Sequence, residues 1–301
     1  MKYLKNTGIL ILLAVLLFAC EKTIKIEIPD NGRRLVVNSF FGQDSVMKIN
    51  LTKSKYILDG SSDYSPVLNA KITLYEEGVR IEELTDLLDG NYIGHYKLKN
   101  DVDYKVEVTA EGFPLASAEN SIPGKTEILN IDAYETMDMY GWPEYNFKLT
   151  FKDDVNAENY YFIQVMERRY VTYTLDDGSD TTFIEDNRLY LQSDDPIAFS
   201  DDWYLEEGVI FNDEVINGKE YTIWFKGNSY YYDNNESRSV YYIIFKTVSK
   251  EFYRYYISLA KHMNAQGEIF MEPVQVYTNI ENGFGIFAGY SADVDSVIIQ
   301  N

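Results

Sequence analysis

The sequence contains a single cysteine and only two histidines in its 301 residues. Without a second thiol the chain forms no internal disulfide, and a structural zinc site would lack its usual thiolate ligands. His95 and His262 lie far apart in the sequence, and neither belongs to an HExxH-like motif. We therefore expect both histidines to be structural and the fold to depend on core burial.

Basic residues are also scarce, with 27 Lys and Arg against 48 Asp and Glu and a formal net charge of −21. Nucleic-acid binding depends on Lys and Arg side chains that displace counterions from phosphates. Anionic lipid surfaces likewise attract basic protein faces. The charge balance therefore argues against nucleic acid and against electrostatic adhesion to a membrane.

Long apolar runs are confined to the N-terminus, where residues 8–18 carry no charge. A helix of this length spans about 16 Å, roughly half of the hydrocarbon thickness of a bilayer. Lys2 and Lys5 precede the run, and Ala19 and Cys20 follow it. This order is typical of a lipoprotein signal. We expect residues 1–19 to be removed and Cys20 to carry a lipid; an ordinary signal peptide is the alternative.

Aromatic residues are abundant, with 27 Tyr, 16 Phe and 3 Trp. Tyrosine together with β-branched residues favours half-buried strands over helices. Apolar and polar residues alternate in several short segments, among them residues 24–28, 47–51, 104–108 and 147–151. The pattern predicts a mostly all-β fold made of two β-sandwich-like domains.

We expect residues 20–32 to form the lipid tether and first strand, residues 33–124 an immunoglobulin-like β-sandwich, and residues 125–301 a second β domain. Pro123-Gly124-Lys125 has the composition of an exposed linker at the boundary. Turns are predicted at Asp89-Gly90, Glu111-Gly112, Asp177-Gly178 and Asn217-Gly218, with Asp89-Gly90 and Asn217-Gly218 each joining a hairpin. A strand is expected at residues 274–277, followed by a glycine-rich turn at 279–289.

One segment has a helical period. Phe252, Tyr256, Leu259 and Met263 share one helical face, with Ser249 placed as an N-cap and a glycine at 267. We predict an amphipathic helix over residues 249–266 in the second domain, covering a sheet face or closing a sheet end.

Acidic loops are the candidate metal sites. Asp153, Asp154, Asn156 and Glu158 offer the oxygen ligands that calcium prefers. Further acidic residues gather at 176–180, 194–195 and 201–202. None of these loops has the ligand spacing and glycine of an EF-hand, so a solvated acidic loop is the alternative. We expect no cofactor besides the lipid, and calcium remains a possible ligand.

Aromatic residues in predicted loops are the candidate binding residues: Trp142, Trp203, Tyr230, Tyr231 and Tyr232. Exposed rings stack on sugars or anchor a partner protein. The alternative is that these rings pack over sheet edges. The sequence has no P-loop and no GxSxG nucleophile elbow. We therefore expect a binding protein and not an enzyme.

Several segments together resemble a known family. They are residues 69–74 (NAKITL), 104–108 (YKVEV), 151–161 (FKDDVNAENYY) and 278–289 (TNIENGFGIFAG). In this order, after a lipoprotein signal, they resemble the Bacteroidota lipoprotein family called domain of unknown function 4249. The similarity covers nearly the whole mature chain. Residues 70–108 alone also resemble carboxypeptidase-regulatory-like and other immunoglobulin-like modules.

The resemblance implies a lipid-anchored protein of the outer membrane, facing the cell surface, with the periplasmic face as the alternative. It also implies an accessory or ligand-binding role beside a TonB-dependent receptor, and it carries over no active site. The other readings are an extracellular calcium-assisted hydrolase and a structural or adhesive surface lipoprotein. For residues 279–290 we expect a role in closing the core of the second domain.

Overall fold

The computed structural model describes residues 32–56, 64–174, 177–199, 208–228, 237–265, 272 and 274–299. Cys20, Trp203 and Tyr230–Tyr232 lie outside these residues, as do the expected signal and all of the expected tether except Gly32. The described part is mostly β, with sheets in a sandwich-like arrangement and one helix, which confirms the predicted fold class. No helix in the described part is long and apolar enough to cross a membrane.

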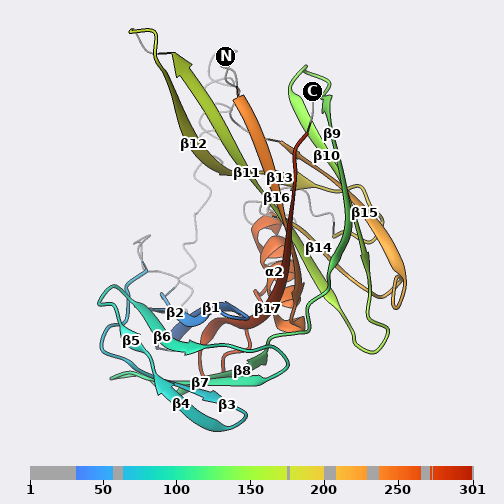
Figure 1. Cartoon of the computed structure of the whole chain (residues 1–301). Helices are drawn as coiled ribbons and strands as arrows, with labels where there is room; N and C mark the ends of the chain where they lie inside the picture. Colours follow the sequence, from blue (N-terminus) through green and yellow to red (C-terminus); the bar gives the residue numbers. More distant parts are fainter. Residues whose placement is uncertain are drawn as a thin grey trace, which may run out of the picture. The chain divides into compact units, whose positions relative to one another are not determined.

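The largest sheet contains nine strands (Figure 1). In spatial order they are β12 (Asp180–Arg188), β11 (Tyr160–Thr174), β16 (Ser237–Val248), β17 (Phe284–Val297), β1 (Leu35–Gly42), β2 (Val46–Lys53), β6 (Asn91–Lys97) and β5 (Thr85–Asp86), with β14 (Val209–Asn212) paired to β11. One four-stranded sheet has the order β4 (Val79–Glu83), β3 (Lys71–Glu76), β7 (Asp103–Thr109) and β8 (Ala116–Ser121). The other has the order β13 (Tyr190–Gln192), β15 (Glu220–Asn228), β10 (Pro143–Lys152) and β9 (Ile128–Met137).

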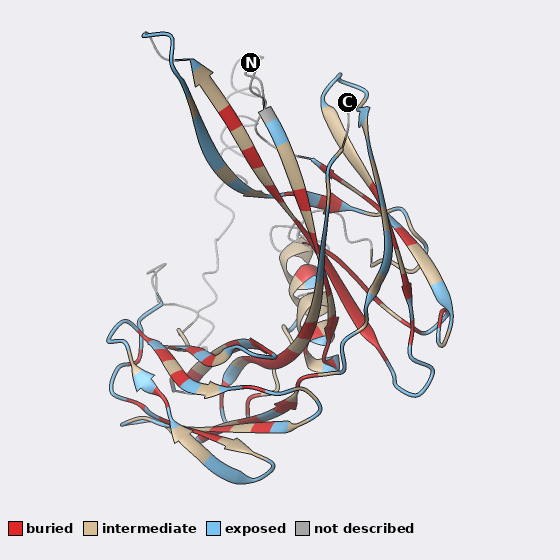
Figure 2. Cartoon of the chain, in the orientation of Figure 1, coloured by how far each residue is buried: buried red, intermediate tan, exposed pale blue. Residues whose placement is uncertain are grey.

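Buried and exposed residues alternate along most strands (Figure 2). The first hydrophobic core contains inward residues of β1, β2, β3 and β7, such as Leu35, Leu51, Ile72 and Val106. All four side chains are almost completely buried. The first core therefore fills a sandwich of two sheets, as the alternating pattern predicts.

A second core lies between β10 and β15 and the strands β11, β14 and β16. Its centre is aromatic: the ring of Phe151 lies 4.9 Å from Phe245 and 5.0 Å from Tyr161, measured between centroids. Such ring pairs add stability beyond the area they bury. This packing turns the other face of the β13-β15-β10-β9 sheet away from the core.

The helix α2 (Lys250–Ala265) covers the opposite face of the nine-stranded sheet. The amide of Phe252 donates a 3.2 Å hydrogen bond to Ser249 Oγ, which confirms the predicted N-cap. The Phe252 ring lies 5.0 Å from Phe40 on β1 and 5.5 Å from Phe162 on β11. Since Tyr161 of β11 points into the second core, Phe162 points to the other face, where α2 packs.

Strand β17 joins the two halves of the chain. It pairs in parallel with β1 and antiparallel with β16, so one sheet runs across the predicted boundary near residue 124. Residues 33–301 group as one compact unit. The division at residue 124 remains a prediction. The first core consists mainly of residues before 124 but also contains Ile280 and Phe287, whereas the second core contains only residues after 124.

The glycine-rich stretch before residue 290 is different from the prediction. Residues 284–289 form the start of β17. A short turn precedes them, with the Gly283 amide donating to the Ile280 carbonyl oxygen at 3.4 Å, and no strand is present at residues 274–277. Phe287 packs 4.5 Å from Phe41, so it closes the first core and not the second. A Cβ atom on Gly289 would lie 2.1 Å from the carbonyl oxygen of Ser121. Close approach of neighbouring backbone, and not a turn, explains this glycine.

The turn predictions had mixed outcomes. Antiparallel pairs β5–β6, β7–β8 and β11–β12 confirm the turns at Asp89-Gly90, Glu111-Gly112 and Asp177-Gly178. The hairpin at Asn217-Gly218 is wrong. The turn is present, but β14 before it pairs with β11, whereas β15 after it pairs with β10. Asn-Gly therefore carries the chain from one sheet to another.

Candidate functional site

The outer face of the β13-β15-β10-β9 sheet carries an exposed tryptophan. In β15, Ile223 and Phe225 are buried in the second core. Trp224 lies between them, so its side chain projects from the opposite face, and 60% of it is exposed. Exposing the large apolar ring of a tryptophan to water is unfavourable, and an exposed tryptophan on a regular strand is a frequent sign of a binding surface.

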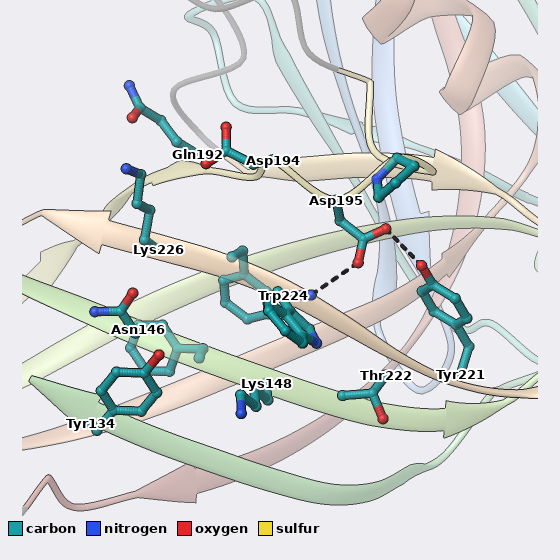
Figure 3. A pocket seen from close by; sticks show the side chains of 13 residues that line it. Tyr134, Asn146, Lys148, Gln192, Asp194, Asp195, Tyr221, Thr222, Trp224 and Lys226 are labelled. Atoms are coloured by element: carbon teal, nitrogen blue, oxygen red, sulfur yellow. Dashed lines mark hydrogen bonds between the residues drawn. The ribbon is translucent and has the colours of Figure 1, made fainter.

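A hollow of about 610 Å³ opens over this face (Figure 3). We call it the Trp224 hollow. Its volume lies within the range of ordinary small-molecule sites. It is lined by Tyr134, Asn146, Phe147, Lys148, Gln192, Asp194, Asp195, Pro196, Tyr221, Thr222, Trp224, Phe225 and Lys226.

Strand register brings these residues together from distant parts of the chain. Lys148 of β10 is directly opposite Trp224 of β15. The Lys148 ammonium lies 5.1 Å from the centre of the Trp224 ring, a distance at which a cation is attracted to the aromatic face. Asn146 is opposite both Lys226 on β15 and Tyr134 on β9.

The loop after β13 forms the rim of the hollow and is held by side-chain hydrogen bonds. Strand β13 ends at Gln192, beyond which no strand of the described part pairs with β15 on that side. There the Trp224 amide donates to Asp195 Oδ2 at 3.3 Å, and Ser193 Oγ donates to the Trp224 carbonyl. The hydroxyl of Tyr221 donates to Asp195 Oδ1 at 2.8 Å. These contacts fix the rim to the sheet.

Tyr221 is protonated at neutral pH, as tyrosines ordinarily are. Burial and the neighbouring Asp195 carboxylate raise the pKa of its hydroxyl further, to about 12. It therefore remains a hydrogen-bond donor to Asp195 over the physiological range. By contrast, the side chains of Gln192 and Asp194 make no hydrogen bond to any described residue. The hollow thus combines a fixed rim with polar groups that a ligand can use.

The structure places Trp142 at a separate position, the tip of the β9–β10 hairpin. Asp138 Oδ1 accepts hydrogen bonds from the amides of Tyr140 and Trp142, both at 2.8 Å. Met139, Tyr140 and Trp142 are 87%, 77% and 55% exposed. An ordered turn therefore presents three large apolar side chains to solvent, which we call the Trp142 tip.

The calcium candidates serve as internal hydrogen-bond acceptors and ion pairs. Asp153 is buried and accepts hydrogen bonds from the Tyr161 hydroxyl and, at 2.7 Å, from the Gly218 amide. Asp154 accepts from the side chain of Asn156 at 2.8 Å. Glu158 lies 3.0 Å from Lys250. Within the described ranges no group of three or more His, Cys, Asp or Glu residues is placed to hold a metal ion.

The two histidines lie in unrelated places. His262 Nδ1 is 2.6 Å from the carbonyl oxygen of Val274, an arrangement that ties the end of α2 to the following segment. His95 is on an exposed part of β6, 3.7 Å from Glu82. Neither residue lines the Trp224 hollow.

Trp224 was missed by the sequence-based reasoning, although the sequence contains a signal for it. In residues 221–226 (YTIWFK), Ile223 and Phe225 occupy the inward positions of an alternating strand. Trp224 therefore falls at a position that is normally polar. A tryptophan on the polar phase of a strand is a better indicator of a binding face than an aromatic residue in a loop.

Comparison with solved structures gives only weak similarity. The collagen adhesin (CNA) from S. aureus is 8% identical, with a TM-score of 0.21, over 88% of this chain and 93% of that chain. The Fcho1 Mu homology domain from Danio rerio, with bound Eps15 peptide, is 10% identical, with a TM-score of 0.19, over 89% of this chain and 96% of that chain. Such scores support no argument about this protein.

No curated protein matches the chain. One family model does match: it is described as "Domain of unknown function (DUF4249)" and covers residues 21–296. The match includes all the strands and the helix of the described structure except the last residue of β17. The chain therefore belongs to the DUF4249 family.

Proposed function

We propose that this protein is a lipid-anchored binding subunit of the outer membrane that works beside a TonB-dependent receptor in uptake. The observation that carries the proposal is the Trp224 hollow, in which an exposed ring is surrounded by unused polar groups on a regular sheet. Sites of this kind bind ligands with little reorganisation, because strands hold the side chains in place.

A hydrolase is supported less well. Its calcium would be held by the acidic loop at residues 153–158, but Asp153 and Glu158 have partners inside the fold. In the hollow, Asp195 accepts hydrogen bonds from Tyr221 and from the backbone of β15, which suits a structural role. Among the described residues of the lining the remaining carboxylate is Asp194, and these residues supply no further carboxylate as the second catalytic group that acid–base hydrolysis requires.

Two features support the anchor and the partner. The lipoprotein signal ends at Cys20, and the resemblance to the family implies an outer-membrane receptor as neighbour. The Trp142 tip offers the aromatic anchors that dominate protein–protein binding energy. A stable complex of this type buries around 1,600 Å² in total, more than the tip alone provides, so neighbouring surface takes part as well.

The test is affinity purification of tagged full-length protein from solubilised membranes, followed by identification of co-purifying proteins. We expect a TonB-dependent receptor with the wild type, and recovery reduced about tenfold or more with a Tyr140→Ala/Trp142→Ala variant. Trp224→Ala is the matched control and should retain the receptor. Absence of any receptor from the wild-type sample rejects the partner. Membrane partitioning that is unchanged by Cys20→Ser rejects the anchor.

A further inference from the structure

We infer that the Trp224 hollow binds a neutral oligosaccharide, with the Trp224 ring as the platform on which one sugar unit stacks. The inference rests on the proposed binding role of this hollow and specifies the class of ligand. Three properties of the site lead to it: the backbone is already paired, the free polar groups include both donors and acceptors, and the lining carries no excess of positive charge.

The first property argues against recognition of a peptide by strand addition at Trp224. Strand β15 lies between β13 and β10, and β10 lies between β15 and β9. Where β13 ends, Ser193 and Asp195 occupy the carbonyl and amide of Trp224. The main-chain groups of Trp224 that would pair with an extended peptide are therefore in use. Beside the Trp224 ring, side chains must recognise the ligand.

The second property is the mixture of free polar groups. Gln192 offers an amide donor and acceptor, Asp194 an acceptor, and the Tyr134 hydroxyl both, and none of them hydrogen-bonds to another described residue. Sugar hydroxyls also donate and accept at once. Their C–H faces are apolar, so a sugar ring satisfies the polar rim and the indole face together.

Trp224 itself is prepared for stacking. The ammonium of Lys148 lies over its ring at 5.1 Å from the centroid, which restrains the ring on the sheet. Since 60% of the residue is exposed, ring surface is left for a ligand. Ordering the ring before binding lowers the entropy cost of binding.

The third property selects a neutral sugar. Among the described residues, the lining contains two cations, Lys148 and Lys226, and two carboxylates, Asp194 and Asp195. Lys226 is also paired with Glu144 at 3.3 Å. A phosphate, sulfate or uronate group would meet no net positive charge here, and desolvating it would be unfavourable.

The test is isothermal titration calorimetry on full-length protein in a detergent without a sugar headgroup, because alkyl maltosides would compete. The probes are maltohexaose, cellohexaose, laminarihexaose, xylohexaose and mannohexaose. At least one should bind with an affinity that is insensitive to salt. Trp224→Ala should weaken that binding about tenfold or more, whereas Trp224→Phe should retain part of it. Trp142→Ala, a change at an exposed tryptophan outside the hollow, should leave it unchanged.

The inference is overturned if no probe binds, or if wild type and Trp224→Ala bind equally. Tighter, salt-dependent binding of polygalacturonate or of a peptide library would also overturn it. If Trp224→Ala fails to fold by near-UV circular dichroism, Gln192→Ala provides the same test at the rim. A receptor in the affinity purification without sugar binding would leave the uptake role standing and reject the sugar. Sugar binding without a receptor would support the sugar site and reject the receptor as partner.

Discussion

The Tyr221 hydroxyl and the Asp195 carboxylate are joined by a 2.8 Å hydrogen bond that connects strand β15 to the rim of the hollow. The same carboxylate also accepts from the amide of Ile197 at 3.2 Å and from that of Trp224 at 3.3 Å. The Asp195 side chain therefore connects three groups: the rim loop at Ile197, the Tyr221 hydroxyl, and the backbone of Trp224 at the edge of β15.

This relationship predicts an alkaline effect on stability. The pKa of Tyr221 in the folded protein is about 12, above its ordinary value of 10.0. A raised pKa of this kind contributes stability that is present below pH 10 and is lost as the pH rises through 12. Tyr221→Phe should therefore be less stable than wild type at pH 8, by roughly 1 kcal/mol. Urea unfolding at several pH values should show the gap closing between pH 10 and 12; a constant gap would contradict the prediction.

A second prediction concerns the buried carboxylate of Asp213. Burial, and then the nearby Asp153, raise its pKa above the ordinary value of 3.8. A carboxyl whose pKa is raised on folding favours the folded state at low pH, and this contribution is lost as the pH rises. Asp213→Asn should retain an acceptor for the Asn159 amide, now at 2.8 Å, and should be more stable than wild type at pH 7. The stability difference between Asp213→Asn and wild type should shrink as the pH falls toward 3.8. Asp213→Ala, which has no acceptor, should be less stable than Asp213→Asn at every pH.

A third prediction tests the close approach of β17 to β8. Gly289→Ala would place Cβ 2.1 Å from the Ser121 carbonyl oxygen, which backbone movement must relieve. We expect a loss of about 1–3 kcal/mol in the free energy of unfolding. Gly124→Ala is the matched control, since the nearest atom to its new Cβ lies 3.8 Å away. Equal urea midpoints for the two variants would show that the contact is unimportant.

A fourth prediction concerns the segment expected to be a linker. Lys125 Nζ and the Ile128 amide both contact the Asp293 carboxylate, each at 2.9 Å, and the Thr126 amide donates to Thr247 Oγ1 at 3.1 Å. Trypsin should therefore cleave slowly after Lys125 in the native protein, because proteolysis requires local opening. Asp293→Ala should accelerate the cut, while Asp295→Ala on the same strand should not. Rapid cleavage of wild type into two resistant fragments would instead support a flexible joint.

The sequence predicts the local structure well and the long-range pairing poorly. Alternation identifies the strand of residues 104–108, and spacing together with Ser249 identifies helix α2, because both depend on neighbouring residues. The parallel partner of β1 is β17, which lies almost the whole chain away, and no local pattern encodes that pairing. The same applies to the hollow, where Lys148 and Trp224 meet only through the register of β10 and β15.

In the candidate site, too, local features can be predicted from the sequence, whereas long-range contacts cannot. Trp142 is exposed as expected, because an Asp-x-x-Gly turn among polar residues is a local feature. Asp153 is buried, although its loop is acidic, because Tyr161 and Gly218 come from other parts of the chain to hydrogen-bond with it. Sequence can thus locate an exposed ring in a turn, but it cannot tell a solvated acid from one that the fold uses.

The pairing of β1 with β17 also determines when this protein can fold. Val37 is in register with Gly285, so the contact closes a loop that includes most of the chain. Contacts of such sequence separation form slowly, and β1 has an open edge and an unfilled core until β17 arrives. During synthesis, the N-terminal half therefore emerges first and waits in an aggregation-prone state for the last strand. A chain that stops before Phe284 would lose the strand that both halves share, so a nonsense mutation near the end should be as damaging as one in the middle.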